Sequence, residues 1–371
     1  ANINMMNDVS KSDESLKKLR NEIDSIDSQL LDLFNQRAHC AISVADVKKT
    51  ASEHSGDAIN FFRPDREAQV IQRIKSENKG PLSDEEVGRL VREVMSACLA
   101  LEQPLKIAYL GPEGTFTQSA ALKHFGHSVS TVPMSSIPDV FNSVESGHAD
   151  YGLVPVENST EGVISHTLDT FVDSKLKICG EVEMRIHHHL VNQSQDVSKI
   201  THIYSHQQSF AQCRRWLNQN FPEIERIPVS SNAEAARIAS LDETAAAICG
   251  IPAVEVFGLA ICFENIEDLS DNTTRFVIIG HQDIAPSGND KTSILISTKN
   301  YPGALLGLLQ PLADHNISMN KIESRPAPER KWEYIFFIDI DGHQDVGNVK
   351  QALIGLKQQA ALFKILGSYP K

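Results

Sequence analysis

The first hundred residues carry a hydrophobic pattern with the period of an α-helix. Residues 13–50 contain no Gly or Pro, and apolar side chains recur there at alternating steps of three and four: Leu16, Leu19, Ile23, Ile26, Leu30 and Leu33. This spacing predicts one long helix with a single apolar stripe. At 1.5 Å per residue the helix would extend on the order of 50 Å, which exceeds the width of a small domain. A second chain is therefore expected to cover the stripe.

Two shorter helices are predicted next, over residues 64–78 and 83–102. Ser83, with Glu86 three residues later, has the pattern of a capping box at a helix start. After the second of these helices the helical period gives way to short apolar strands that alternate with helices. A domain boundary is therefore expected near Pro104.

The middle of the chain repeats one arrangement, an apolar strand followed by a polar turn. Strands are expected over residues 105–110, 151–156 and 203–204, and the turns after them carry Gly111 to Thr117, Glu157-Asn158-Ser159 and Ser205-His206-Gln207-Gln208. Ligands of α/β sheets bind outside the carboxyl ends of strands, so these turns are expected to converge on one site.

A hydroxyl and a guanidinium stand side by side further along the chain. Thr274 and Arg275 come just before the apolar run of residues 276–280, which is predicted to be a buried strand. This combination suits a small carboxylate ligand. The same pair also fits an ordinary junction between a loop and a strand, where both side chains bond to local backbone groups.

The last part of the chain predicts a small mixed domain. Residues 282–290 contain Pro, Ser, Gly and Asn in succession and are expected to form a linker. Beyond it the pattern predicts strand, helix, strand, strand, helix and strand, over residues 292–297, 303–315, 317–324, 334–340, 346–360 and 363–367. This order is that of an α+β ferredoxin-like unit.

Composition excludes several classes of partner. The formal net charge is -13 and no basic run stands out, which argues against nucleic acid and membrane surfaces. The polar start of the chain has no apolar signal core and no later stretch is long enough to span a bilayer, so a cytoplasmic protein is expected. The six cysteines lack Cys-x-x-Cys spacing, and His187-His188-His189 has no completing ligand nearby, so no metal is expected.

Charged residues interrupt the apolar stripe of the first helix. Buried cations are costly unless paired, and each one taken alone also fits a surface ion pair. Together, Leu16-x-x-Leu19-Arg20, Asp27-x-x-Leu30-Leu31-x-Leu33, Arg37, Lys48 and Arg66-Glu67 resemble the all-helical chorismate mutases over about residues 13–102. The resemblance implies an intertwined helical dimer whose substrate is a dianion that rearranges without a nucleophile.

The same resemblance implies a role for each of these residues. Arg20 would come from the partner chain and would hold the substrate carboxylates together with Arg37 and Arg66. Lys48 would face the ether oxygen, and Glu67 the ring hydroxyl.

Two departures from the pattern concern Arg63, where some relatives carry Asp, and the last helix. There Cys98 and Glu102 stand where some relatives have Ser and Gln. A Gln amide donates a hydrogen bond to the ether oxygen at any pH, whereas Glu donates only when protonated. Mutase activity is therefore predicted to rise towards acid pH unless the site raises the pKa of Glu102.

The central motifs resemble prephenate dehydratase over about residues 105–281. They are Gly111-Pro112-x-Gly114-Thr115-Phe116, Val154-Pro155-Val156-Glu157-Asn158-Ser159, Ser205-His206-x-Gln208 and Thr274-Arg275-Phe276. The resemblance implies two α/β lobes, as in periplasmic binding proteins, with substrate in the cleft between them and the second lobe over about residues 183–264. Thr274 would bond to the leaving hydroxyl or deliver a proton to it, with Glu157 as a candidate relay. Arg275 would bind a carboxylate, and Asn158, Ser159, Ser205 and Gln208 would complete the pocket.

Two motifs of the last domain resemble the ACT regulatory domain of phenylalanine-sensitive dehydratases. They are Gly303-Ala304-Leu305 at a helix start and Glu323-Ser324-Arg325-Pro326 after the second strand. The resemblance implies that phenylalanine binds at the helix N-terminus and the adjoining loops of paired domains. The alternative is a dimerisation module that binds no ligand.

Together the three resemblances predict a multidomain enzyme, with a mutase domain over residues 1–103, a dehydratase domain over 104–282 and an ACT domain over 291–371. It would convert chorismate through prephenate to phenylpyruvate as a homodimer or higher oligomer, without a cofactor and under inhibition by phenylalanine. One alternative is a non-catalytic phenylalanine sensor that retains the dehydratase and ACT folds. Another is a mutase fused to prephenate dehydrogenase, which the lack of a dinucleotide fingerprint disfavours.

Overall fold

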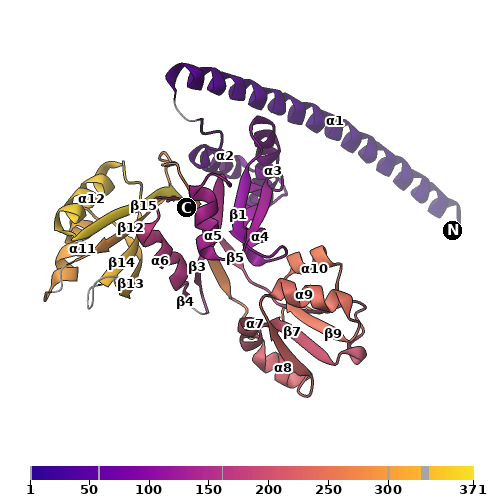
Figure 1. Ribbon diagram of the computed structural model, residues 1–371. Helices are drawn as coiled ribbons and strands as arrows, with labels where there is room; N and C mark the ends of the chain where they lie inside the picture. The colour runs from indigo at the N-terminus through magenta and orange to yellow at the C-terminus, as the bar shows by residue number, and fades with distance from the viewer. Residues whose placement is uncertain (1, 57–58, 161, 299–300, 327–333) are drawn as a thin grey trace.

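The computed structural model describes residues 2–56, 59–160, 162–298, 301–326 and 334–371. Its N-terminal part is one long helix, α1 (Asn2–Ser55), followed by α2 (Pro64–Glu77) and α3 (Asp84–Glu102). With 54 residues, α1 is about 80 Å long. Figure 1 shows it extending well past the two shorter helices. The prediction of a single long helix is confirmed, and the helix is longer than its apolar pattern indicated.

Local sequence explains the ends of the two shorter helices. Pro64 occupies the first turn of α2, where a missing N–H costs nothing. Ser83 caps α3, and its hydroxyl accepts a hydrogen bond from the backbone N–H of Glu86 at 3.2 Å. In contrast to these packed helices, α1 leaves its apolar stripe open: Leu19 and Ile23 are 54% and 55% exposed within one chain.

The central part begins with a six-stranded sheet that forms the first lobe. The strand order is β2-β1-β3-β11-β5, with β4 paired to β3. The strands are β1 (Lys106–Leu110), β2 (Ser130–Met134), β3 (Tyr151–Asn158), β4 (Gly162–Val163), β5 (Lys177–Arg185) and β11 (Thr273–Gly280). The helices α4 (Phe116–Phe125), α5 (Ile137–Glu145) and α6 (Ser165–Asp173) pack against it, with Val140 and Phe171 in the core.

A second lobe is inserted between β5 and β11. Its sheet has the order β10-β6-β9-β7-β8, formed by β6 (His189–Asn192), β7 (His202–His206), β8 (Glu225–Val229), β9 (Ala245–Cys249) and β10 (Ala260–Phe263). Its helices are α7 (Gln207–Gln212), α8 (Arg214–Asn220), α9 (Asn232–Leu241) and α10 (Ile251–Phe257), and a 3₁₀ turn spans Val197–Lys199. The two predicted lobes are confirmed. The helices α7 and α8 are separated at Cys213.

The C-terminal part has the predicted order of strands and helices. It consists of β12 (Asp290–Ser297), α11 (Ala304–Asp314), β13 (Met319–Pro326), β14 (Tyr334–Asp341), α12 (Gly347–Gln359) and β15 (Leu362–Pro370), with sheet order β13-β14-β12-β15. The two helices cover one face through Ile294, Leu308 and Ile338.

The other face of this C-terminal sheet packs directly on the first lobe, as Figure 1 shows. Leu295, Phe337 and Leu366 join Phe141 in one continuous hydrophobic core. Gly367 permits the close approach of β15 to β5, because a Cβ at this position would lie 2.2 Å from the carbonyl oxygen of Ile178. The C-terminal domain and the first lobe therefore share one hydrophobic core.

Among the described residues, none of the helices combines the length and the apolar character that a bilayer crossing requires.

Candidate active sites

Thr274 lies at the start of β11, where the chain returns from the second lobe to the first. The side chain is 9% exposed, and its Oγ1 accepts a hydrogen bond of 2.8 Å from Nδ2 of Asn158. Asn158 is the last residue of β3 and stands directly opposite Thr274 in the antiparallel register. Because the amide occupies the oxygen as a donor, the hydroxyl proton of Thr274 points elsewhere and is available to an acceptor.

A chain of amides extends from this pair to the two segments that cross between the lobes. Nδ2 of Asn158 also donates to Oδ1 of Asn272 at 2.9 Å. Asn272 in turn donates to Oε1 of Gln212 at 3.2 Å, and that oxygen lies 2.7 Å from Nε2 of His188. Burial lowers the pKa of His188, so its ring is neutral at physiological pH. The site is thus a buried, uncharged hydrogen-bonding network.

The other predicted dehydratase residues contribute in different ways. Ser159 accepts from the backbone N–H of Thr273 at 2.9 Å and so fixes the turn beside the pair. Ser205 is fully buried and donates to Oδ1 of Asn232 at 3.0 Å, which braces β7 against α9. Gln208 lies in the first turn of α7, where its backbone N–H bonds to the His206 ring. The structure therefore brings Asn158 and Ser159 to Thr274, while Ser205 is committed within the second lobe.

Arg275 lies on the opposite face of β11 from Thr274. Its Nε donates to Glu181 at 2.7 Å, its Nη1 to Asp339 at 2.7 Å, and its Nη2 to the hydroxyl of Tyr369 at 3.1 Å. Adjacent residues of a strand point to opposite faces, so the guanidinium cannot share the space of the Thr274 hydroxyl. The predicted contact of Arg275 with a substrate carboxylate stays a prediction, and in this structure the guanidinium is bonded to Glu181, Asp339 and Tyr369 instead. Glu157, the candidate relay, also points to this far face, where it pairs with Lys321.

The helical region brings a second group of predicted residues together. Nζ of Lys48 on α1 lies 4.0 Å from Oε2 of Glu102 at the end of α3, and that oxygen is buried with no hydrogen-bond partner in the part of the chain that the structure describes. Burial raises the pKa of Glu102, against the opposing charges of Lys48 and Arg37. The Glu102 carboxyl therefore stays protonated to higher pH than an ordinary Glu does. Such a raised pKa is the exception that the sequence prediction included.

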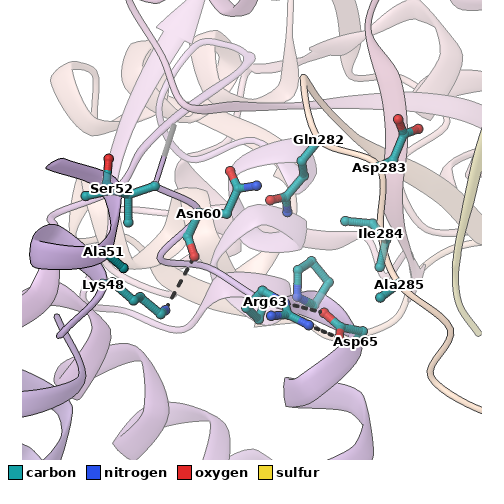
Figure 2. Close-up of a pocket in the computed structure, with 12 residues that line it drawn as sticks. Lys48, Ala51, Ser52, Asn60, Arg63, Asp65, Gln282, Asp283, Ile284 and Ala285 are labelled. Atoms are coloured by element: carbon teal, nitrogen blue, oxygen red, sulfur yellow. Dashed lines mark hydrogen bonds and ion pairs between the residues drawn. The ribbon is translucent and has the colours of Figure 1, made fainter. Parts of the chain in front are cut away.

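Lys48 also borders a cavity of about 420 Å³ between the helices and the rest of the chain. Figure 2 shows this cavity, with Lys48 bonded to the Asn60 carbonyl and Arg63 joined to Asp65 by two hydrogen bonds of 2.7 and 3.0 Å. Its far wall is Gln282 to Ala285, the start of the linker to the C-terminal domain. The mutase-like lysine therefore lies beside the segment that connects the other two domains.

The remaining helical residues are placed differently from one another. Arg20, Arg37 and Arg66 are exposed within one chain, and the first two lie on the uncovered α1. Glu67 instead pairs with Nε of Arg92 at 3.0 Å, and burial raises its pKa against that opposing charge. Glu67 lines a different cavity, which also contains His124 and Glu181 of the first lobe. Within one chain the predicted contact of Glu67 with the ring hydroxyl is therefore not supported.

The predicted effector residues lie at two separate edges of the C-terminal domain. Gly303 caps α11 in a left-handed conformation with φ of 81°, followed by buried Ala304 and half-buried Leu305. On β13, Glu323 and Ser324 precede Arg325, whose Nη2 bonds to Asp169 of α6 at 3.0 Å. In this structure Arg325 is therefore engaged by the first lobe.

Sequence reasoning missed three residues of the Thr274 network. Asn272 was part of the stretch around Thr274 but had no assigned role. Gln212 lies four residues after Gln208, so it shares a helical face with a predicted site residue. His188 belongs to the His187-His188-His189 run, whose sequence raises only the question of a metal site. The described residues contain no cluster of three or more His, Cys, Asp or Glu side chains that could hold a metal ion. Of the three, only Gln212 had a usable spacing signal.

Comparisons with known proteins agree with this division into three parts. The family model for chorismate mutase type II matches residues 19–103, that for prephenate dehydratase matches residues 107–284, and that for the ACT domain matches residues 292–358.

Full-length relatives and a solved structure extend the comparison. The chain is 53% identical to a bifunctional chorismate mutase/prephenate dehydratase of Pseudomonas aeruginosa, over 96% of this chain and 98% of that protein. It is 50% identical to one of Neisseria gonorrhoeae over the same shares. A prephenate dehydratase of Arthrobacter aurescens, solved in complex with L-Phe, aligns with a TM-score of 0.67 and 33% identity, over 72% of this chain and 90% of that one.

Proposed function

The chain belongs to the bifunctional chorismate mutase/prephenate dehydratase family, and we propose that its two reactions occur at the Lys48–Glu102 region and at the Asn158–Thr274 pair. The first region rearranges chorismate to prephenate. The second converts prephenate to phenylpyruvate, carbon dioxide and water. The observation that carries the dehydratase assignment is the buried bond of 2.8 Å between Asn158 and Thr274 where the two lobes join.

The dehydratase reaction asks for a proton at one oxygen. The ring C–O bond breaks as its oxygen accepts a proton and leaves as water. The ring carboxylate leaves as carbon dioxide, and the electron pair of that C–C bond completes the aromatic ring. Thr274 suits the first event, because Asn158 orients its oxygen and leaves its proton free to donate to the departing hydroxyl. The neutral amides around it exclude a competing fixed charge.

The mutase reaction requires cations that hold a dianionic substrate, and it requires no nucleophile. Lys48 and Arg37 flank Glu102 on one chain, while Arg20 precedes Lys48 by 28 residues of α1, which is roughly 40 Å along the helix axis and beyond the reach of that group. Covering the exposed stripe of α1 with a second α1 would bring the partner chain's copy of this arginine to the site. We therefore take the working enzyme to be a dimer with mutase sites shared between chains.

Regulation is assigned to the C-terminal domain. Phenylalanine would bind at the α11 start, where backbone N–H groups and the helix dipole favour a carboxylate. Its binding there would reach the dehydratase through the hydrophobic interior that the two domains share.

The experiment that tests the dehydratase site compares wild type, Thr274→Ala and Thr274→Ser in both assays on the same preparations. Thr274→Ala is expected to lower the dehydratase kcat by about 10²- to 10⁴-fold, since a positioned proton donor contributes that much. Thr274→Ser keeps the hydroxyl and should retain most of the activity. Mutase activity should be unchanged in both variants. Full dehydratase activity in Thr274→Ala would refute the assignment.

A further inference from the structure

Two neighbouring strands of the first lobe each present one residue to the Thr274 site and the next residue to the C-terminal domain. In the β3–β11 register Thr274 stands opposite Asn158, and Arg275 stands opposite Glu157. Strand alternation sends the first pair to one face and the second pair to the other. The register then shifts by one residue after Arg275, a bulge of the kind that aims side chains beside active sites.

Arg275 is hydrogen-bonded to residues of the C-terminal domain in a closed network of polar side chains. Asp339 of β14 and Tyr369 of β15 both bond to its guanidinium, and Oγ of Ser293 on β12 joins them, at 2.5 Å from Asp339 and 2.7 Å from the Tyr369 hydroxyl. Glu181 of β5 closes the other side, where it also accepts from Nζ of Lys291 at 2.6 Å. Two cations and two carboxylates thus balance their charges across the domain boundary.

This network is buried, which makes its geometry demanding. The side chains of Arg275, Glu181 and Asp339 are each 12% exposed or less, and Tyr369 is fully buried. Burial alone would lower the pKa of Arg275, but Tyr369, Asp339 and Glu181 together raise it, so the guanidinium stays charged. A buried charge that loses its partner is strongly destabilised. The C-terminal sheet cannot therefore shift against β11 without either moving Arg275 with it or breaking these bonds.

Glu157 on the neighbouring strand is held by a single ion pair, and its side chain is 38% exposed. Its Oε2 accepts from Nζ of Lys321 on β13 at 2.5 Å, and the lysine side chain is 20% exposed. The C-terminal domain therefore holds the residue next to each member of the Asn158–Thr274 pair. A displacement of the C-terminal sheet would therefore pull on β3 and β11 at the residues next in sequence to Asn158 and Thr274.

We propose that Arg275 and Glu157 are positioning residues of the dehydratase, through which the C-terminal sheet sets the geometry of the Asn158–Thr274 pair. Both side chains contact the C-terminal domain, on the face opposite to the Thr274 hydroxyl. The proposal rests on the proposed function of Thr274, and it adds a route for regulation: phenylalanine that shifts the C-terminal sheet would change the dehydratase kcat through Arg275 and Glu157.

The test removes the C-terminal half of the network with isosteric changes. Asp339→Asn and Tyr369→Phe keep the shapes of their side chains. The matched control is Asp169→Asn, which breaks the Arg325 ion pair, another contact between the two domains that shares no residue with the Arg275 network. Dehydratase kcat and KM are measured without phenylalanine, together with mutase activity and the thermal unfolding midpoint of each preparation.

Asp339→Asn is expected to lower the dehydratase kcat by about 10- to 100-fold with little change in KM, because small misplacements of a catalytic group cost this much. Tyr369→Phe should do so less, and Asp169→Asn should leave kcat at its wild-type value. Mutase activity should be unchanged in all three. Arg275→Lys, which keeps the charge, should retain more kcat than Arg275→Gln.

Phenylalanine separates positioning from mere stability. In Asp339→Asn, calorimetry should find that phenylalanine binds at wild-type affinity. Its inhibition of the dehydratase should be weaker, because the Arg275–Asp339 contact that couples the two domains is weakened. Equal kcat values in Asp339→Asn, Asp169→Asn and wild type would overturn the proposal and leave the role of Thr274 intact. A kcat loss that follows the unfolding midpoint in all variants alike would also overturn it. Absence of dehydratase activity in the wild type would instead refute the proposed function itself.

Discussion

The two candidate active sites of this chain are prepared in opposite ways. Thr274 is 9% exposed and already bonded to Asn158, so the dehydratase pair is complete within one chain. The helical site is open: Lys48 is 30% exposed, Arg20 is exposed, and the stripe of α1 that carries it has no cover. One site is preorganised by folding, and the other depends on association.

The chemistry of the two reactions accounts for this difference. Both substrates are dianions, but aromatisation drives the dehydratase step, so its chemical event asks for one directed proton, which a neutral network supplies. The mutase must hold a dianion with several cations, and cations gathered without their ligand repel one another and lose hydration. Placing Arg20 on one chain and Lys48 on another lets assembly, not folding, bring the charges together.

The sharpest test of this contrast is complementation between two inactive variants. Arg20→Ala and Lys48→Ala should each lower mutase activity by about 10²- to 10³-fold, the usual loss when one electrostatic contact to the transition state is removed. If the two residues of one site come from different chains, unfolding and refolding an equal mixture should recover about a quarter of wild-type activity, because half of the dimers are mixed and each holds one intact site.

Dehydratase activity serves as the control for that experiment, since each chain carries its own complete Asn158–Thr274 pair. It should stay at the wild-type level in both variants and in the mixture. Mixing that recovers no mutase activity, despite intact dehydratase, would show that Arg20 and Lys48 act within one chain.

A smaller effect is expected from the acidity of Glu102. Its pKa is raised by burial, so the protonated form that donates to the ether oxygen persists to higher pH than for an ordinary Glu. Mutase kcat should be highest on the acid side and fall by up to about tenfold per pH unit above this pKa. Glu102→Gln, which donates at every pH, should give a flat profile. A wild-type profile as flat as that of the Gln variant would contradict this role.

The contrast between the sites also separates what sequence could predict from what it could not. Periodicity predicted α1 and the βαββαβ order, because each depends on spacing along the chain, and the family resemblance supplied the two lobes. The side that Arg275 faces was not predictable in the same way. Its neighbour Thr274 made a substrate contact plausible, but strand alternation and the sequence-distant Asp339 and Tyr369 place the guanidinium at the C-terminal domain in this structure. Contacts with residues of another domain cannot be predicted from the local sequence.

Glu67 illustrates the same limit in the helical region. Helical spacing places it next to Arg66 on α2, but which cavity it lines depends on Arg92 of α3 and on the first lobe behind it. Asn272 and His188 join the Thr274 network only because the two crossing segments meet. Residues whose function depends on the meeting of separate segments are those that spacing arguments miss.

The smallest expected effect concerns the junction between the helical region and the first lobe, where His124 of α4 is half-buried. Its ring packs on Phe62 of the segment that leads from α1, at 6.4 Å between centroids, and its Nε2 has no hydrogen-bond partner among the described residues. Burial, with a further contribution from Arg92, lowers the pKa of His124 to about 3. The ring is therefore neutral in the folded protein down to strongly acid pH.

The sign of the resulting pH dependence follows from linkage. The unfolded chain binds the His124 proton below a pH of about 6.5, whereas the folded protein does not until about 3, so stability is full above 6.5 and is lost as the pH falls between these values. The loss should approach about 1.4 kcal/mol per pH unit within that window. Urea unfolding at several pH values, compared between wild type and His124→Gln, measures it. The variant should lose this part of the acid sensitivity while both activities at neutral pH are retained. An equally steep decline in the variant would show that His124 does not couple the junction to pH.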